Sequence, residues 1–316
     1  MKIGFLFPGQ GAQVIGMGKD LYEKYEEVRK IYDKVQKITG IDIKKISFEG
    51  PDELLNETQY TQIAILTESL AILEILKKNR INAEMSTGLS LGEYTALIED
   101  GVISFDDGVK LVEKRGKIMQ NLTPNGNWKM AAIMGLDEEQ VEDICKKVKS
   151  GFVVPANYNT IGQIVISGEE KAILKAEELA KEAGAKKVSI LKTSGPFHTS
   201  KLEKCSEVLK EELQQININK QNSKVVKNID GEMYKATDNI VDILSKHIMN
   251  PVRFTKCLQT MYNNGINTFI EIGPGKTLSG FVKRMKFEGP VKIMNISNCN
   301  ELEKVIEELT ELSNLN

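Results

Sequence analysis

The alternation of apolar and polar residues along the chain predicts an α/β protein. An apolar run over 2–7 is typical of a buried strand, and it stops at the turn-forming residues 8–11. A second short strand is predicted over 83–87, and a helical pattern over 91–98 follows it almost at once. The pattern therefore predicts a strand, a tight turn and a helix around Ser90.

A different rhythm runs through the middle of the chain. Strands are predicted over 130–134, 151–156, 163–167 and 187–191, and helices over 138–148 and 171–183. The order βαββαβ is the ferredoxin-like pattern.

Helix and strand alternation resumes after this segment, with a strand predicted over 267–272 and a closing helix from Glu301. We therefore expect an α/β domain formed by 1–127 and 195–316, interrupted by a smaller inserted domain over 128–194.

Composition and charge exclude several classes of function. The chain has 316 residues, 41% of them hydrophobic and 27% charged, and its 42 basic and 44 acidic residues give a net charge of −2. Because no long run carries one sign of charge, we expect neither a nucleic-acid partner nor a membrane surface. The apolar start is too short for a signal peptide, and no stretch is long enough to span a membrane.

The cysteines indicate a reducing compartment. No Cys-x-x-Cys pair occurs, and the four cysteines are far apart, at Cys145, Cys205, Cys257 and Cys299. This spacing predicts neither a disulfide framework nor a zinc site, and a cytoplasmic location fits it.

The segment Gly88–Gly92 has the Gly-x-Ser-x-Gly pattern of a nucleophile elbow, with Ser90 at its centre. The glycines would let the backbone turn sharply, and the helix N-terminus together with the amide of Leu91 would stabilise an oxyanion. Taken alone, the pattern fits a plain glycine-rich turn equally well.

A serine nucleophile needs a base, and the chain has only two histidines. His198 lies on a predicted turn after the inserted domain, whereas His247 lies in a helical run over 240–249. We favour His198 because catalytic residues concentrate on loops. No acidic residue between Ser90 and His198 carries a recognisable motif, and the two histidines do not have the spacing of a common metal site.

Six segments together resemble malonyl-CoA:acyl carrier protein transacylases. They occur in that family's order and span most of the chain: Phe7–Gly11, Gly88–Tyr94, Arg115–Gly116, Gly195–His198, Asn250–Val252 and Glu271–Lys276. The resemblance implies a hydrolase-like α/β domain that carries a ferredoxin-like insertion.

The resemblance also implies roles for individual residues. His198 would activate Ser90, and the backbone amides of Gln10 and Leu91 would form the oxyanion hole. Arg115 would bind the free carboxylate of the malonyl group through two parallel charge-assisted hydrogen bonds. Without the family, its context in Glu113–Lys117 indicates a solvated helix face.

Two positions differ from the family, and a third bears on which acyl group the enzyme accepts. His247 stands where relatives usually have a glutamine whose main-chain carbonyl orients the catalytic histidine. Leu89 stands where many relatives have a histidine. Phe197 resembles the malonyl-selective version of its loop, in which a bulky ring disfavours methylmalonyl groups.

The predicted reaction is a ping-pong transfer of malonyl from malonyl-CoA to the phosphopantetheine thiol of acyl carrier protein, through a malonyl ester on Ser90, for fatty acid synthesis. No metal or redox cofactor is expected. Because carrier proteins of this type are acidic, Lys276, Lys283, Arg284 and Lys286 are candidates for a docking patch, although such a run is usually a solvated face.

Three alternatives remain at this point: a serine hydrolase of the same fold class, a non-catalytic module that binds carrier protein, and a related acyltransferase of polyketide or malonate metabolism. Arg115 argues against the first, and the presence of both Ser90 and His198 argues against the second.

Overall fold

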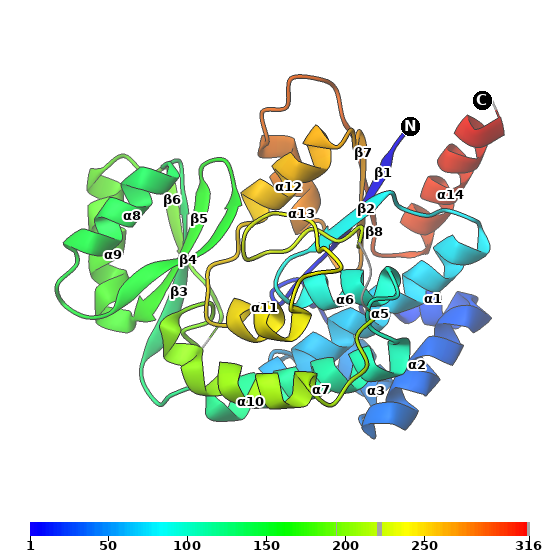
Figure 1. The fold of residues 1–316 in the computed structure, drawn as a ribbon, viewed down its shortest axis with the longest axis horizontal. Helices are drawn as coiled ribbons and strands as arrows, with labels where there is room; N and C mark the ends of the chain where they lie inside the picture. The colour runs from blue at the N-terminus through cyan, green and yellow to red at the C-terminus, as the bar shows by residue number, and fades with distance from the viewer. Residues whose placement is uncertain (194, 220–222, 315–316) are drawn as a thin grey trace.

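The computed structural model describes residues 1–193, 195–219 and 223–314 and has a mixed α/β fold, as predicted. Figure 1 shows a larger part that contains both ends of the chain and a smaller part built from the middle of the sequence. Ser194, which the sequence places at the end of the inserted domain, lies outside the described residues.

The larger part is built on a parallel sheet. Its strand order is β2-β1-β7-β8, and the bounds are Ile3–Phe7 for β1, Met85–Gly88 for β2, Thr268–Ile272 for β7 and Lys292–Ile296 for β8. Central strand β1 pairs with β2 on one side and with β7 on the other. Every residue of β1, β2 and β7 is buried, as expected for parallel strands covered on both faces.

Helices surround this sheet. Their bounds are Lys19–Lys24 for α1, Glu26–Thr39 for α2, Ile43–Glu49 for α3, Asp52–Leu55 for α4, Thr58–Lys78 for α5, Leu91–Glu99 for α6, Phe105–Leu122 for α7, Glu203–Leu213 for α10, Ile240–His247 for α11, Phe254–Asn263 for α12, Thr277–Arg284 for α13 and Cys299–Asn314 for α14, with a short 3-10 turn, η1, over Ser200–Leu202.

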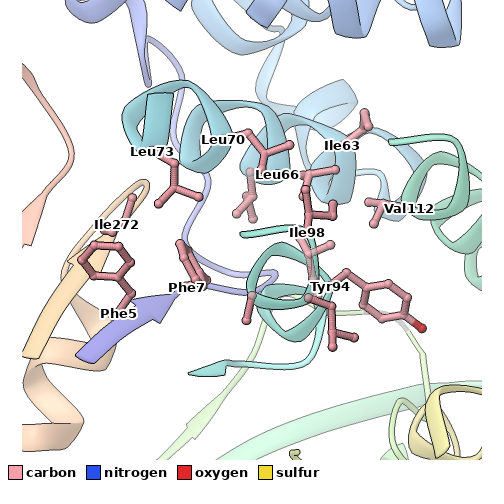
Figure 2. Packing of buried hydrophobic residues seen from close by; sticks show 14 of the residues in the cluster. Phe5, Phe7, Ile63, Leu66, Leu70, Leu73, Tyr94, Ile98, Val112 and Ile272 are labelled. Carbon is pink, nitrogen blue, oxygen red and sulfur yellow. The ribbon is translucent and has the colours of Figure 1, made fainter. Parts of the chain in front are cut away.

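The centre of the core lies between α5 and the sheet. Helix α5 is apolar around most of its circumference, and most of its residues are buried. Figure 2 shows Leu66 and Leu70 of α5 near Phe7 of β1 and Tyr94 of α6. This packing fixes α5, α6 and the end of β1 relative to one another.

The smaller part is an antiparallel sheet with two helices. The sheet order is β4-β5-β3-β6, and the bounds are Trp128–Met134 for β3, Val153–Thr160 for β4, Gln163–Glu169 for β5, Lys187–Ile190 for β6, Glu138–Lys147 for α8 and Glu170–Glu182 for α9. A capping box between Asp137 and Gln140 begins α8. The elements occur in the βαββαβ order that the sequence predicts.

The two faces of this small sheet differ in what they contact. Ala131 and Ile133 of β3 belong to a separate core cluster with α8 and α9. Met130 and Ala132 point the other way, because side chains alternate along a strand, and they line a cleft beside the larger part.

Strand β4 joins the two parts. The amide of Tyr158 donates to the carbonyl of Val252 (2.8 Å), the amide of Val252 donates to the carbonyl of Ala156 (2.9 Å), and Thr160 Oγ1 donates to the carbonyl of Phe281 (2.9 Å). The sequence predicts that this strand ends at residue 156, whereas it continues to Thr160. The polar residues of this extension hide the strand pattern, because they face the cleft and the junction.

No helix among the described residues is long and apolar enough to cross a membrane.

Candidate active site

Ser90 lies between β2 and α6 with backbone angles φ 54° and ψ −99°. The flanking glycines are required by close packing, since a Cβ on Gly88 would lie 2.1 Å from the Gly92 carbonyl carbon and one on Gly92 would lie 2.0 Å from the Phe7 carbonyl oxygen. The sequence analysis attributes the sharp turn to the backbone freedom of the glycines, and this reason is wrong. The positive φ belongs to Ser90, and neither glycine has one. A serine held in this way is typical of a nucleophile elbow.

Asn228 holds the elbow from the opposite side. Its Oδ1 accepts a hydrogen bond from the Ser90 amide (2.8 Å), and its Nδ2 donates to the Gly88 carbonyl (2.8 Å). The side chain is fully buried. Sequence reasoning missed Asn228 because it lies in an irregular segment without a motif.

His198 lies beside Ser90, with Nε2 2.8 Å from the serine Oγ. Its Nδ1 lies 3.1 Å from the carbonyl oxygens of both His247 and Asn250. Carbonyl oxygens only accept hydrogen bonds, so this geometry favours the tautomer with the proton on Nδ1 and leaves Nε2 free to accept the serine proton.

The surroundings of His198 keep the ring neutral. Burial and, after it, the positive charge of Arg115 lower its pKa to about 4, although the two carbonyls act in the opposite direction. A neutral imidazole at pH 7 is the form that a general base requires.

His247 contributes its main chain to this arrangement. Its carbonyl contacts His198 Nδ1, whereas its own ring lies with its centroid 5.0 Å from that of His198. The His247 side chain is buried at the end of α11, and its Nδ1 lies 3.4 Å from Oε2 of Glu93.

Arg115 projects from α7 into the same site. Its Nη2 donates to Ser90 Oγ (3.1 Å), its Nη1 donates to Oε1 of Gln62 on α5 (2.6 Å), and its Cζ lies 5.0 Å from the ring centroid of Tyr94. The side chain is 1% exposed, and within the described parts of the chain no carboxylate lies within 4.0 Å of it. The expectation from local context, a solvated helix face, is therefore wrong for Arg115.

The neighbours of Arg115 explain the misleading context. Lys114 and Lys117 lie at the surface and pair with Glu212 and Glu113. Gly116 lets α7 approach α5 closely, since a Cβ there would lie 2.9 Å from the Cα of Gln59.

Gln10 and Leu91 both line the cleft next to Ser90. Neither backbone amide has a protein acceptor among the residues that the structure describes. The Gln10 side chain donates to Thr58 Oγ1 (3.1 Å), which ties the turn after β1 to the start of α5. Both amides are available for an oxyanion.

The cleft has a volume of about 240 Å³ and lies between the larger part and the small sheet. Phe197, 6% exposed, lines it, and Leu89 packs against the apolar cluster that contains Phe281. Asn157 and Asn159 of β4 also line it, and Oδ1 of Asn159 has no partner among the described residues. These two amides were missed because they lie on the unpredicted extension of β4.

The candidate basic residues do not all lie together. Arg284 and Lys286 border a surface groove with Lys186 and Lys187 of the smaller part, whereas Lys276 and Lys283 do not line that groove. Lys186 and Lys187 are distant in sequence from the other two and were not predicted.

The described residues contain no group of three or more His, Cys, Asp or Glu side chains arranged to hold a metal ion. All four cysteines are unpaired.

Comparison with known proteins gives a consistent result. The family described as "Acyl transferase domain" matches residues 4–313. The chain is 40% identical over 312 residues to the malonyl CoA-acyl carrier protein transacylase of Bacillus subtilis strain 168, covering 98% of each chain.

Solved structures agree with these matches. A malonyl CoA-acyl carrier protein transacylase from Clostridium perfringens superposes with a TM-score of 0.94 at 45% identity and covers 100% of this chain and 99% of its own. A malonyl-transacylase in complex with a type II polyketide acyl-carrier protein has a TM-score of 0.92 at 33% identity, covering 98% of this chain and 100% of its own.

Proposed function

The chain belongs to the malonyl CoA-acyl carrier protein transacylase family, and on that premise we propose that it transfers malonyl from malonyl-CoA to acyl carrier protein through an ester on Ser90. The product would supply fatty acid synthesis. The chain is an acyltransferase, and malonyl-CoA and acyl carrier protein are its substrates.

The observation that carries this proposal is Arg115. A buried guanidinium without a carboxylate partner, 3.1 Å from the nucleophile, is a site for an anionic acyl group. An esterase for neutral acyl groups has no use for such a charge. The malonyl carboxylate would replace Ser90 Oγ and Gln62 as acceptors of the guanidinium hydrogen bonds.

The first half-reaction forms the acyl-enzyme. His198 Nε2 takes the proton of Ser90 Oγ as the oxygen attacks the thioester carbonyl, and the carbonyls of His247 and Asn250 hold the resulting imidazolium. The amides of Gln10 and Leu91 bind the oxyanion. The tetrahedral intermediate collapses, and the coenzyme A thiol leaves with the proton from His198.

The second half-reaction runs in reverse with another thiol. The phosphopantetheine thiol of the carrier protein gives its proton to His198 and attacks the ester carbonyl, and Ser90 leaves as the alcohol. Each step is an acyl transfer without change of oxidation state, so the residues of the site supply the chemistry and we propose no cofactor beyond the two substrates.

We propose that the larger part, 1–127 and 195–316, is a hydrolase-like catalytic domain and that 128–194 is a ferredoxin-like insertion. The parallel sheet order β2-β1-β7-β8 and the antiparallel order β4-β5-β3-β6 support this division. In this division, the larger domain supplies the nucleophile, base and arginine, and the insertion closes the acyl cleft with Met130, Ala132 and Asn157.

The four unpaired cysteines are consistent with a reducing compartment such as the cytoplasm.

The groove bordered by Lys186, Lys187, Arg284 and Lys286 is our proposed docking surface for the acidic carrier protein. It combines residues from both parts, and none of the three lysines has an ion-pair partner in the described residues. Opposite charges across such a surface guide encounter and orientation.

The direct test is to incubate the purified protein with malonyl-CoA, without carrier protein, and to measure its intact mass. We expect one malonyl group on the wild type and none on Ser90→Ala. A matched control is Ser189→Ala on β6, which does not line the cleft and should react like the wild type. An unmodified wild type, or a malonylated Ser90→Ala, would contradict the mechanism.

The same sample distinguishes a transferase from a hydrolase. Adding phosphopantetheinylated carrier protein should discharge the acyl-enzyme far faster than water does. Release of free malonate at the same rate with and without carrier protein would support the hydrolase instead.

A further inference from the structure

Glu93 is a fully buried carboxyl group on α6, three residues after the nucleophile. Its Oε1 accepts a hydrogen bond from the Tyr234 hydroxyl (2.5 Å), and its Oε2 accepts one from the Asn228 amide (3.1 Å). The same Oε2 lies 3.4 Å from Nδ1 of His247. The reaction described above uses none of these three contacts.

One contact leads to the nucleophile. Asn228 binds the Ser90 amide and the Gly88 carbonyl through its side chain, while Glu93 holds the main chain of Asn228. Ser90 has a positive φ, a conformation that persists only where the surroundings enforce it. Glu93 therefore fixes the residue that enforces the backbone conformation at the nucleophile.

The other contact leads to the base. His247 presents its carbonyl to His198 Nδ1, and its ring faces Glu93. Both ring nitrogens of His247 are buried, and in the part of the chain described neither has a hydrogen-bond partner. The Glu93 carboxyl lies 3.4 Å from Nδ1, so it is placed to restrain this ring and, with it, the position of the carbonyl.

We propose that Glu93 is a positioning residue that sets the relative placement of Ser90, through Asn228, and of His198, through His247. This inference rests on the proposed function of Ser90 and His198. A carboxyl group suits the task because its two oxygens can accept hydrogen bonds from several directions at once.

The Glu93 carboxyl acts through its length and shape more than through its charge. Burial raises its pKa to about 7 and lowers the pKa of His247 well below its usual range, so His247 is neutral and the Glu93 carboxyl is not held fully charged near pH 7. Glutamine has the same length and keeps one acceptor for the Asn228 amide, while its NH₂ group can donate to the Tyr234 oxygen. Aspartate keeps the charge but is one methylene too short to reach.

The test compares Glu93→Gln with Glu93→Asp in the full-length protein. The rate constant for malonylation of Ser90 at saturating malonyl-CoA is measured by rapid-quench intact mass, together with the KM for malonyl-CoA. We expect Glu93→Asp to lower the rate constant by roughly 10- to 100-fold with KM changed less than about threefold, because misplacement by about 1 Å costs that much in rate. Glu93→Gln should stay within about fivefold of the wild type.

Tyr234→Phe is the matched control. It removes the donor to Oε1 and leaves the contacts of Oε2 with Asn228 and His247, so its rate constant should stay within about threefold of the wild type. A loss as large as that of Glu93→Asp would overturn the proposal, because the two paths through Oε2 would then not be the ones that matter.

Other outcomes also overturn it. An active Glu93→Asp with an impaired Glu93→Gln would make charge the relevant property, and equal rates in all variants would remove Glu93 from the mechanism. A change confined to KM would make the role structural.

A double variant tests the path to the nucleophile. Glu93→Asp combined with Asn228→Ala should lose less than the product of the two single losses, because both disturb one connection. Strictly multiplicative losses would contradict the link.

Failure of this inference can be separated from failure of the proposed function. If the wild type does not react with malonyl-CoA, the function is wrong. The same variants are then compared by their rate of modification with a small fluorophosphonate, which needs only an activated serine. Equal rates for wild type and Glu93→Asp in that reaction would overturn the role of Glu93 independently.

Discussion

Replacing Arg115 should convert a selective malonyl transferase into an unselective acyltransferase that transfers malonyl poorly. The guanidinium offers two N–H groups that now contact Ser90 and Gln62 and would bind the malonyl carboxylate. Hydrogen bonds to charged groups contribute about 1.5–3 kcal/mol each, so Arg115→Ala removes about 3–6 kcal/mol from malonyl transfer. That energy corresponds to a loss of roughly 10²- to 10⁴-fold in kcat/KM.

Acetyl-CoA is the internal comparison, because it has the same thioester and no carboxylate. The positive charge of Arg115 also lowers the pKa of His198, so its removal makes the base slightly stronger at neutral pH. Acetyl transfer by Arg115→Ala should therefore be unchanged or faster. The quantity to report is the ratio of the malonyl and acetyl rates, measured by intact mass in single turnover.

Controls separate this effect from damage to α7. Lys114→Ala changes the adjacent residue, which is exposed and pairs with Glu212 at the surface, and should leave both rates intact. Arg115→Lys keeps a charge but loses the two parallel hydrogen bonds, so it should fall between the wild type and the alanine variant. Equal losses of malonyl and acetyl transfer in Arg115→Ala would refute the assignment.

The remaining predictions concern the base, the acyl pocket, the elbow and the docking groove. Because the pKa of His198 is lowered to about 4, kcat/KM for malonyl-CoA should stay high until the pH falls to near 4; a midpoint near pH 6.5 would contradict this. Phe197→Ala should raise the ratio of methylmalonyl to malonyl transfer by about tenfold, measured by competition, whereas no change would exclude Phe197 from selecting the acyl group. Gly92→Ala, whose Cβ would lie 2.0 Å from a carbonyl oxygen of β1, should lower the melting temperature by about 5 °C or more in calorimetry, and an unchanged value would mean that the backbone yields freely. The double variant Lys187→Glu, Arg284→Glu should raise the KM for carrier protein about tenfold at low salt while malonylation by malonyl-CoA is unchanged, and an equal effect on both half-reactions would rule out a docking role.

The arrangement of elements could be predicted from the sequence because apolar periodicity reports burial directly. The strands and helices of the small sheet occur in the predicted order, since β3 and β5 are apolar and largely buried and the helices that follow them are amphipathic. The prediction failed at the end of β4. There the polar residues up to Thr160 face a cleft and a junction, and polar residues in such places look like a loop.

The candidate site was less accessible to sequence reasoning. The pattern around Ser90 and the position of His198 on a turn are local features, so they can be recognised in one segment. The burial of Arg115 depends on how closely α7 approaches α5 at Gly116, which the surrounding lysines conceal. Asn228 lies in an irregular segment, and only the fold brings it to the elbow.

The missing counterion of Arg115 has a thermodynamic consequence. A guanidinium that is 1% exposed and lacks a carboxylate partner in the described structure lowers the stability of the free protein. The carboxylate of a malonyl ester on Ser90 would pair with the guanidinium only in the folded state, and an interaction made only there stabilises that state. The malonylated enzyme should therefore be more stable to heat than the free enzyme. Its melting temperature then reports the fraction of the protein that carries a malonyl group.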